Sequence, residues 1–104
     1  MKKQQLLNEI KKLVLQQEPE AEIILYGSYA RGDFRDDSDM DILILLKKDK
    51  ISYADEKRIT YPLYALEFQS GQIISPLILS KNNWEKKFTI TPLFENVKTE
   101  GKRL

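Results

Sequence analysis

The chain has 104 residues, of which 41% are hydrophobic and 32% charged, and its formal net charge is +1. This is the composition of an ordinary globular protein rather than a disordered one. The sequence contains no cysteine and no histidine, which excludes disulfides, thiolate and imidazole metal sites, and histidine acid–base chemistry. Any catalysis must therefore use carboxylates, hydroxyls, Lys or Arg, or a metal ion held by oxygen ligands.

The charge and the apolar segments also bear on location. A net charge near neutrality provides no global field that would attract nucleic acid. The first residues lack the apolar run of a signal peptide, and no apolar stretch approaches the ~20 residues that span a bilayer. We expect one cytoplasmic domain over residues 1–104, with no membrane association and no direct binding to nucleic acid.

The first half of the chain predicts a helix followed by two strands. Apolar residues recur at three- and four-residue steps over residues 2–17, which predicts a helix that ends before Pro19. Residues 21–26 predict a short buried strand, and residues 28–31 a short helix that leads into a polar loop. Residues 41–46 are apolar on both faces and predict a central strand.

A longer helix is expected next. Ser52 and Asp55 have the spacing of a capping box, and the helix that they begin is expected to extend to about Gln69. Pro62 lies inside this segment and predicts a kink or a break. The chain contains no repeats and no linker that would divide it.

The last third predicts one strand and two helices. Residues 72–79 read as a third strand, in which Pro76 favours an edge position or a bulge. Ser80 is expected to open a short helix, and Thr91 and Pro92 to cap and begin a final helix that ends near Gly101. The order of elements predicts an α/β (α+β) fold in which a small sheet packs against helices.

A glycine–serine pair follows the first predicted strand, where the chain turns into a helix. Such a turn presents free backbone N–H groups, which suit a phosphate, and the Ser28 hydroxyl adds a donor. Gly27 lets the backbone approach a phosphate because it has no β-carbon. We therefore interpret Gly27 and Ser28 as a candidate nucleotide-binding pair.

Two aspartates lie at the start of the central strand. Asp39 and Asp41 are two residues apart, so their carboxylates project from the same face of the strand. Neighbouring carboxylates repel unless a cation lies between them, and hard oxygen ligands suit Mg²⁺ or Mn²⁺. A phosphate-binding turn beside a carboxylate pair is the arrangement that metal-assisted nucleotidyl transfer requires.

The motif Gly27-Ser28, followed at Asp39 and Asp41 by an Asp-x-Asp pair that begins an apolar strand, resembles the DNA polymerase beta nucleotidyltransferase superfamily, in its minimal, MNT-like antitoxin branch. The resemblance implies a mixed sheet flanked by helices. It also implies an ATP site with two Mg²⁺ ions, in which Gly27 and Ser28 hold the triphosphate and Asp39 and Asp41 hold the metals and are catalytic. The implied reaction transfers AMP to a hydroxyl acceptor, often a tyrosine of a HEPN-domain toxin partner.

One element of the family pattern is missing from the sequence. Active members usually carry a third carboxylate on the next strand, where this chain has no acid and Ser75 aligns instead. Glu67 and Glu85 are the nearby acids that could substitute. Two hypotheses follow: an enzyme that adenylylates a partner protein, or a weakly active or inactive module that neutralises a partner by contact.

For several side chains the sequence is compatible with two roles. Arg31 either clamps the triphosphate or forms a salt bridge to the acidic loop, whereas Arg35 favours the structural role. The aromatic side chains of the second half are expected in the core or in a patch that faces a partner; they are Tyr53, Tyr61, Tyr64, Phe68, Trp84, Phe88 and Phe94. The oligomeric state stays open.

Overall fold

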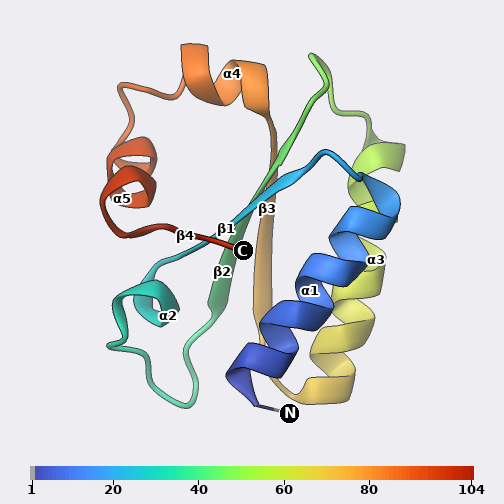
Figure 1. Cartoon of the computed structure of the whole chain (residues 1–104), viewed down its shortest axis with the longest axis vertical. Coiled ribbons are helices and arrows are strands. Elements are labelled where there is room, and N and C mark those ends of the chain that lie inside the picture. Colours follow the sequence, from blue (N-terminus) through green and yellow to red (C-terminus); the bar gives the residue numbers. More distant parts are fainter. Residues whose placement is uncertain (1) are drawn as a thin grey trace.

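The computed structural model describes residues 2–104 and shows a four-stranded sheet with helices on both faces (Figure 1). The predicted order of helices and strands is confirmed, with one additional strand at the end. The elements are α1 (Lys3–Gln17), β1 (Glu22–Tyr26), α2 (Ser28–Arg31), β2 (Met40–Leu46), α3 (Tyr53–Ser70), β3 (Ile74–Ser80), α4 (Lys81–Lys86), α5 (Pro92–Glu100) and β4 (Lys102–Arg103).

The strands form one mixed sheet in the order β3-β2-β1-β4. β2 pairs in parallel with β3, and β1 pairs antiparallel with both β2 and β4. The parallel pair requires a crossover, which α3 provides. β2 is internal, as its apolar sequence predicted, and β3 lies at an edge, where Pro76 does not interrupt an internal ladder.

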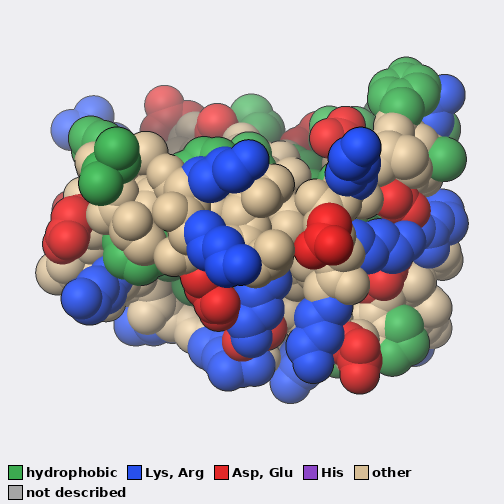
Figure 2. Space-filling view, turned by 90° about the horizontal axis from the view of Figure 1, so that it is seen from above, with side chains coloured by type: hydrophobic (Ala, Val, Ile, Leu, Met, Phe, Trp, Pro, Cys, Tyr) green, Lys and Arg blue, Asp and Glu red, His purple; other side chains and the backbone are tan. Residues whose placement is uncertain are grey.

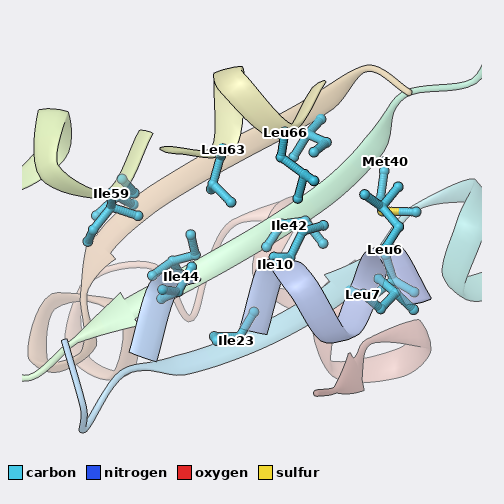
Figure 3. Packing of buried hydrophobic residues seen from close by; sticks show 14 of the residues in the cluster. Leu6, Leu7, Ile10, Ile23, Met40, Ile42, Ile44, Ile59, Leu63 and Leu66 are labelled. Atoms are coloured by element: carbon cyan, nitrogen blue, oxygen red, sulfur yellow. The ribbon is translucent and has the colours of Figure 1, made fainter. Parts of the chain in front are cut away.

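The main core lies between the sheet and the α1–α3 layer (Figure 3). Alternation along β2 sends Ile42 and Ile44 to this face, and Leu43 and Leu45 to the opposite face beneath α4 and α5. The same alternation places Asp41 on the α4–α5 face. The labelled core side chains are Leu6, Leu7, Ile10, Ile23, Met40, Ile42, Ile44, Ile59, Leu63 and Leu66.

Three expectations need correction. β3 begins at Ile74 rather than residue 72, because the Gln72 N–H donates to the Ser70 hydroxyl and not to a strand. α3 passes through Pro62 without a break. The carbonyl that would have accepted the N–H missing from Pro62 belongs to Arg58, four residues earlier. β4 was not predicted at all.

The predicted capping box at the start of α3 is present and belongs to a network of charges. The Asp55 N–H donates to Ser52 Oγ at 3.1 Å, and the Ser52 N–H donates to Asp55 Oδ2 at 3.0 Å. Lys48 and Arg58 each bridge Asp55 and Glu18. Figure 2, which looks down on this end of the molecule, shows acidic and basic side chains interspersed rather than gathered into one basic patch.

The aromatic side chains divide between the core, which was one of the places expected for them, and the exposed surface of α3, whose role as a patch that faces a partner stays a prediction. Trp84 is buried, and Phe88 and Phe94 pack against it in the core beneath α4 and α5. The four aromatic residues on α3 instead face solvent, and Phe68 is 93% exposed. Those four are Tyr53, Tyr61, Tyr64 and Phe68. No helix within residues 2–104 combines the length and hydrophobicity needed to cross a bilayer.

Candidate functional site

The candidate site begins at the turn between β1 and α2. Gly27 has φ 74° and ψ −157°, a conformation that is essentially restricted to glycine, and it caps the N-terminus of α2. Its carbonyl accepts from the N–H groups of Ala30 and Arg31 at 3.1 and 3.0 Å. These two bonds leave the N–H groups of Ser28 and Tyr29, the first two residues of α2, without an acceptor in the helix, so the N-terminus of α2 presents these donors.

Asp41 lies against Gly27. The two residues meet because Tyr26 pairs with Asp41 in the β1–β2 register, so the turn that follows β1 passes over the Asp41 side chain. A β-carbon added to Gly27 would overlap Asp41 Oδ2. The glycine therefore has two roles: it adopts a positive φ, and it leaves room for the carboxylate.

Ser75 adjoins the aspartate pair on the other side. It is the register partner of Asp41 in the parallel β2–β3 ladder. Its hydroxyl donates to Asp39 Oδ2 at 3.3 Å. Ser75 thus occupies the position beside the pair that the sequence alignment gave it, with a hydroxyl where a third carboxylate was expected.

The two acids proposed as substitutes for the third carboxylate are engaged elsewhere. Glu67 accepts the Ile74 N–H at 2.7 Å, where β3 begins. Glu85 lies on α4 near Lys81, at 4.0 Å. Within residues 2–104 no three acidic side chains are grouped so that they could hold a metal ion.

The electrostatics of the aspartate pair favour a cation. Burial raises the pKa of Asp41, and the negative charge of Asp39 raises it further. Arg31 acts in the opposite direction, and Glu100 adds to the increase. Burial also raises the pKa of Tyr26, and the negative charge of Asp41 adds to that increase. Repulsion between the two carboxylates is the condition that a bound divalent cation relieves.

The donor set fits Mg²⁺. Asp39 and Asp41 offer carboxylate oxygens, and Ser75 offers a hydroxyl, all of which are hard ligands. Mg²⁺ commonly takes only one or two carboxylates and completes its shell with water and substrate phosphates. A pair of aspartates beside a candidate phosphate-binding turn therefore offers enough ligands for a metal that arrives with a nucleotide.

Arg31 forms ion pairs with two acids. Its Nε lies 3.1 Å from Asp33 Oδ2, which is the salt bridge to the acidic loop that the sequence left open. Its Nη1 donates to both carboxylate oxygens of Glu100, at 3.2 and 3.0 Å. These two hydrogen-bonded acids raise the pKa of Arg31, Glu100 being the larger contributor. About half of the Arg31 side chain (46%) is nevertheless exposed.

Glu100 was not found by sequence reasoning. It is the last residue of α5, and its Oε1 also accepts the Gly27 N–H at 3.2 Å. Only 18% of its side chain is exposed. The residue is separated from Arg31 by 69 positions, and no motif marks it, so the sequence offers no signal for this contact.

Comparison with known proteins identifies the family. A model of the nucleotidyltransferase domain matches residues 7–91, and the chain belongs to this family. Two relatives are putative protein adenylyltransferases of Methanocaldococcus jannaschii. One is 42% identical over 60 residues, which are 57% of this chain and 59% of the relative. The other is 34% identical over 82 residues, 79% of this chain and 75% of the relative.

A solved structure shares the fold. A chain of a toxin–antitoxin complex crystallised with AMP-PNP is 25% identical and superposes with a TM-score of 0.65, covering 92% of this chain and 69% of that one. The expected family and the expected fold are thereby confirmed. The match to the first archaeal relative spans less than two thirds of that relative's length. The match to the family model ends at residue 91, before α5 begins, so all of α5 including Glu100 lies outside it.

Proposed function

We propose that this chain transfers AMP from MgATP to a hydroxyl group on a partner protein. Gly27 and Ser28 hold the triphosphate, and Asp39 and Asp41 hold the metal. The observation that carries the proposal is the close approach of Gly27 to Asp41, because it brings the turn proposed to bind phosphate and a carboxylate proposed to bind the metal into one site. Membership of the nucleotidyltransferase family and the adenylyltransferase relatives support it.

In the proposed reaction the chain's own residues bind the nucleotide and the metal and supply a base for the acceptor proton. The acceptor hydroxyl attacks the α-phosphorus, the bond from that phosphorus to the oxygen bridging to the β-phosphorus breaks, and pyrophosphate leaves. Asp39 and Asp41 would hold Mg²⁺, which would supply neutralisation of the phosphate charge. The acceptor proton requires a base, and Ser75 is a poor one near neutral pH. Asp39 accepts a hydrogen bond from the Ser75 hydroxyl and is exposed. It is therefore the carboxylate beside Ser75 that is available to take the proton.

The proposed acceptor belongs to another protein. The similar structure with AMP-PNP is a toxin–antitoxin complex, which supports a role as an antitoxin that modifies its toxin. The family resemblance implies a HEPN-domain toxin with a tyrosine acceptor. No third carboxylate joins the aspartate pair within residues 2–104, which also supports a second candidate function, in which the same fold transfers AMP slowly or not at all and neutralises the partner by contact.

The two candidate functions differ in the fate of the α-phosphate. The chain is incubated with an extract of its source cells as a pool of acceptors, together with Mg²⁺ and ATP labelled at either the α- or the γ-phosphate. The proposal predicts that the α-label becomes attached to a protein and the γ-label does not. Asp39→Asn/Asp41→Asn should abolish the labelling. Asp36→Asn/Asp37→Asn, an equal charge change on the exposed loop, should preserve it.

Each alternative result has its own meaning. Labelling of protein from the γ-position would show phosphoryl transfer and would contradict the proposed reaction. Nucleotide binding without labelling from either position would support the contact-only function. Labelling by the Asp39→Asn/Asp41→Asn variant at the wild-type rate would remove the aspartate pair from the mechanism.

A further inference from the structure

Glu100 occupies the Gly27 N–H, in the turn that the proposed function assigns to the triphosphate, and it pairs with Arg31, for which a clamp on the triphosphate is one of two possible roles. Its carboxylate accepts the Gly27 N–H at 3.2 Å and two hydrogen bonds from Arg31 Nη1 at 3.2 and 3.0 Å. A carboxylate and a phosphate both present anionic oxygens to the same kind of donor, and the guanidinium fork suits either one. The side chain therefore lies where a phosphate oxygen would be expected.

This contact cannot coexist fully with a bound triphosphate. A backbone N–H is a single donor, so Gly27 cannot give its hydrogen to a phosphate while Glu100 accepts it. The charges also conflict, because within residues 2–104 Arg31 is the one cation paired with Glu100, while Asp41 lies close enough for the two acids to interact. A nucleotide that enters the site would bring further negative charge beside Glu100.

The position of Glu100 is fixed by the packing of its own helix. The N–H of Gly101, the next residue, donates to the Val97 carbonyl, and a β-carbon on Gly101 would meet both Val97 and Ile24 of β1. Lys102 then pairs with Leu25 in the β1–β4 ladder. The end of α5 is thus held tightly against β1, and the Glu100 side chain is brought to the turn that follows β1.

We propose that Glu100 is an internal competitor for the triphosphate and sets the nucleotide affinity of this site. In the free protein the Glu100 carboxylate accepts hydrogen bonds from the Gly27 N–H and from Arg31. These hydrogen bonds must break when the triphosphate binds. This inference rests on the proposed function, because it requires the triphosphate to use the Gly27 turn. It makes Glu100 an affinity-determining residue and not a ligand for the nucleotide.

The test compares nucleotide affinity with stability. MgATP binding is measured by calorimetry, and thermal unfolding without nucleotide is measured in parallel, for the wild type, Glu100→Gln and Glu100→Ala. Removal of the competing charge should tighten MgATP binding about threefold to tenfold, the factor that one partly exposed charge-assisted hydrogen bond represents. The same variants should unfold at a lower temperature than the wild type, because the pairing with Arg31 is lost.

Glu95→Gln is the matched control. Glu95 lies in the first turn of the same helix, is exposed and undergoes the same change of charge, so its MgATP affinity should equal the wild-type value, and its unfolding temperature should fall only slightly because a first-turn charge is lost. A purely structural role for Glu100 would lower stability without tightening nucleotide binding. Tighter MgATP binding together with a lower unfolding temperature is therefore expected only if Glu100 competes with the triphosphate.

The remaining outcomes separate this inference from the proposed function. If the wild type binds MgATP and both Glu100 variants bind it equally or more weakly, Glu100 supports Arg31 rather than competing, and the inference is wrong while the proposed function stands. If neither the wild type nor the variants bind MgATP, both are wrong, because no nucleotide competes for the turn.

Discussion

Gly27 and Asp41 face each other at the β1–β2 end of the sheet with no space for a β-carbon between them. The register that pairs Tyr26 with Asp41 produces this approach, and the positive φ of Gly27 directs the chain into α2. One glycine therefore supports both the fold of the turn and the position of the carboxylate.

Replacement of this glycine should be unusually costly. Gly27→Ala should lower the free energy of unfolding by at least about 2 kcal/mol, because the backbone conformation is unfavourable for alanine and the methyl group overlaps Asp41. MgATP binding should be lost even at temperatures where the variant stays folded. Chemical denaturation and calorimetry measure the two effects.

Gly71→Ala is the control for that measurement. Gly71 also has a positive φ, 76°, but a β-carbon there would meet nothing within 4 Å. We expect a loss of about 1 kcal/mol from the backbone conformation alone, and no change in MgATP affinity. Equal losses of stability for the two variants would show that contact with Asp41 is unimportant.

A carboxylate at position 75 should restore the missing ligand. Ser75 adjoins both aspartates, so Ser75→Asp would place a third negative charge beside Asp39 and Asp41. The variant should bind Mn²⁺ about tenfold or more tightly than the wild type, as expected for an added carboxylate ligand. It should also be less stable than the wild type in EDTA, because like charges repel. AMP transfer should increase.

Ser75→Asn separates charge from size in the same experiment. Asparagine is close to aspartate in volume but brings no charge, so its Mn²⁺ affinity should stay near the wild-type value. The interpretation of position 75 would be contradicted if Ser75→Asp and Ser75→Asn bound Mn²⁺ equally.

The pH dependence of the free energy of unfolding should reveal the unfavourable environment of the ionised Asp41 carboxylate. Because burial and Asp39 raise the pKa of Asp41 in the folded state, the folded protein holds this proton more tightly than the unfolded chain. Stability therefore falls as pH rises from the ordinary aspartate pKa through the raised value. Asp41→Asn in EDTA should be more stable than the wild type above this window, and the difference should shrink below it.

Thermal unfolding across pH checks this expectation, with Asp36→Asn as an exposed control. Added Mg²⁺ should stabilise the wild type and should have little effect on Asp41→Asn, since the cation relieves a repulsion that the variant lacks. An Asp41→Asn variant that is less stable than the wild type at neutral pH would show that the carboxylate is a net stabilising group.

Local patterns predicted most of this fold. The apolar run of β2 identified a central strand, and the Ser52–Asp55 spacing identified the start of α3, because both features act within a few residues. β4 was missed because two exposed, charged residues carry no strand pattern, and they pair only because Gly101 and α5 bring them to β1.

The candidate site divides in the same way. The turn at Gly27 and the Asp39–Asp41 spacing could be predicted from the sequence because each lies within one short segment. Their roles in binding stay predictions. The contact between Arg31 and Glu100 could not be predicted from the sequence, because a surface arginine can pair with any acid that the fold brings near it. Ser75 could be placed from the order of the strands, but its hydrogen bond to Asp39 required the register.

The most direct test of the account is calorimetric binding of ATP, with and without Mg²⁺, to the wild type and to Asp39→Asn/Asp41→Asn. The account predicts binding by the wild type that requires Mg²⁺ and falls below detection in the double variant. Asp36→Asn/Asp37→Asn should bind as the wild type does. Absence of wild-type binding at millimolar ATP, or equal binding by the Asp39→Asn/Asp41→Asn variant, would contradict the assignment of this site to MgATP.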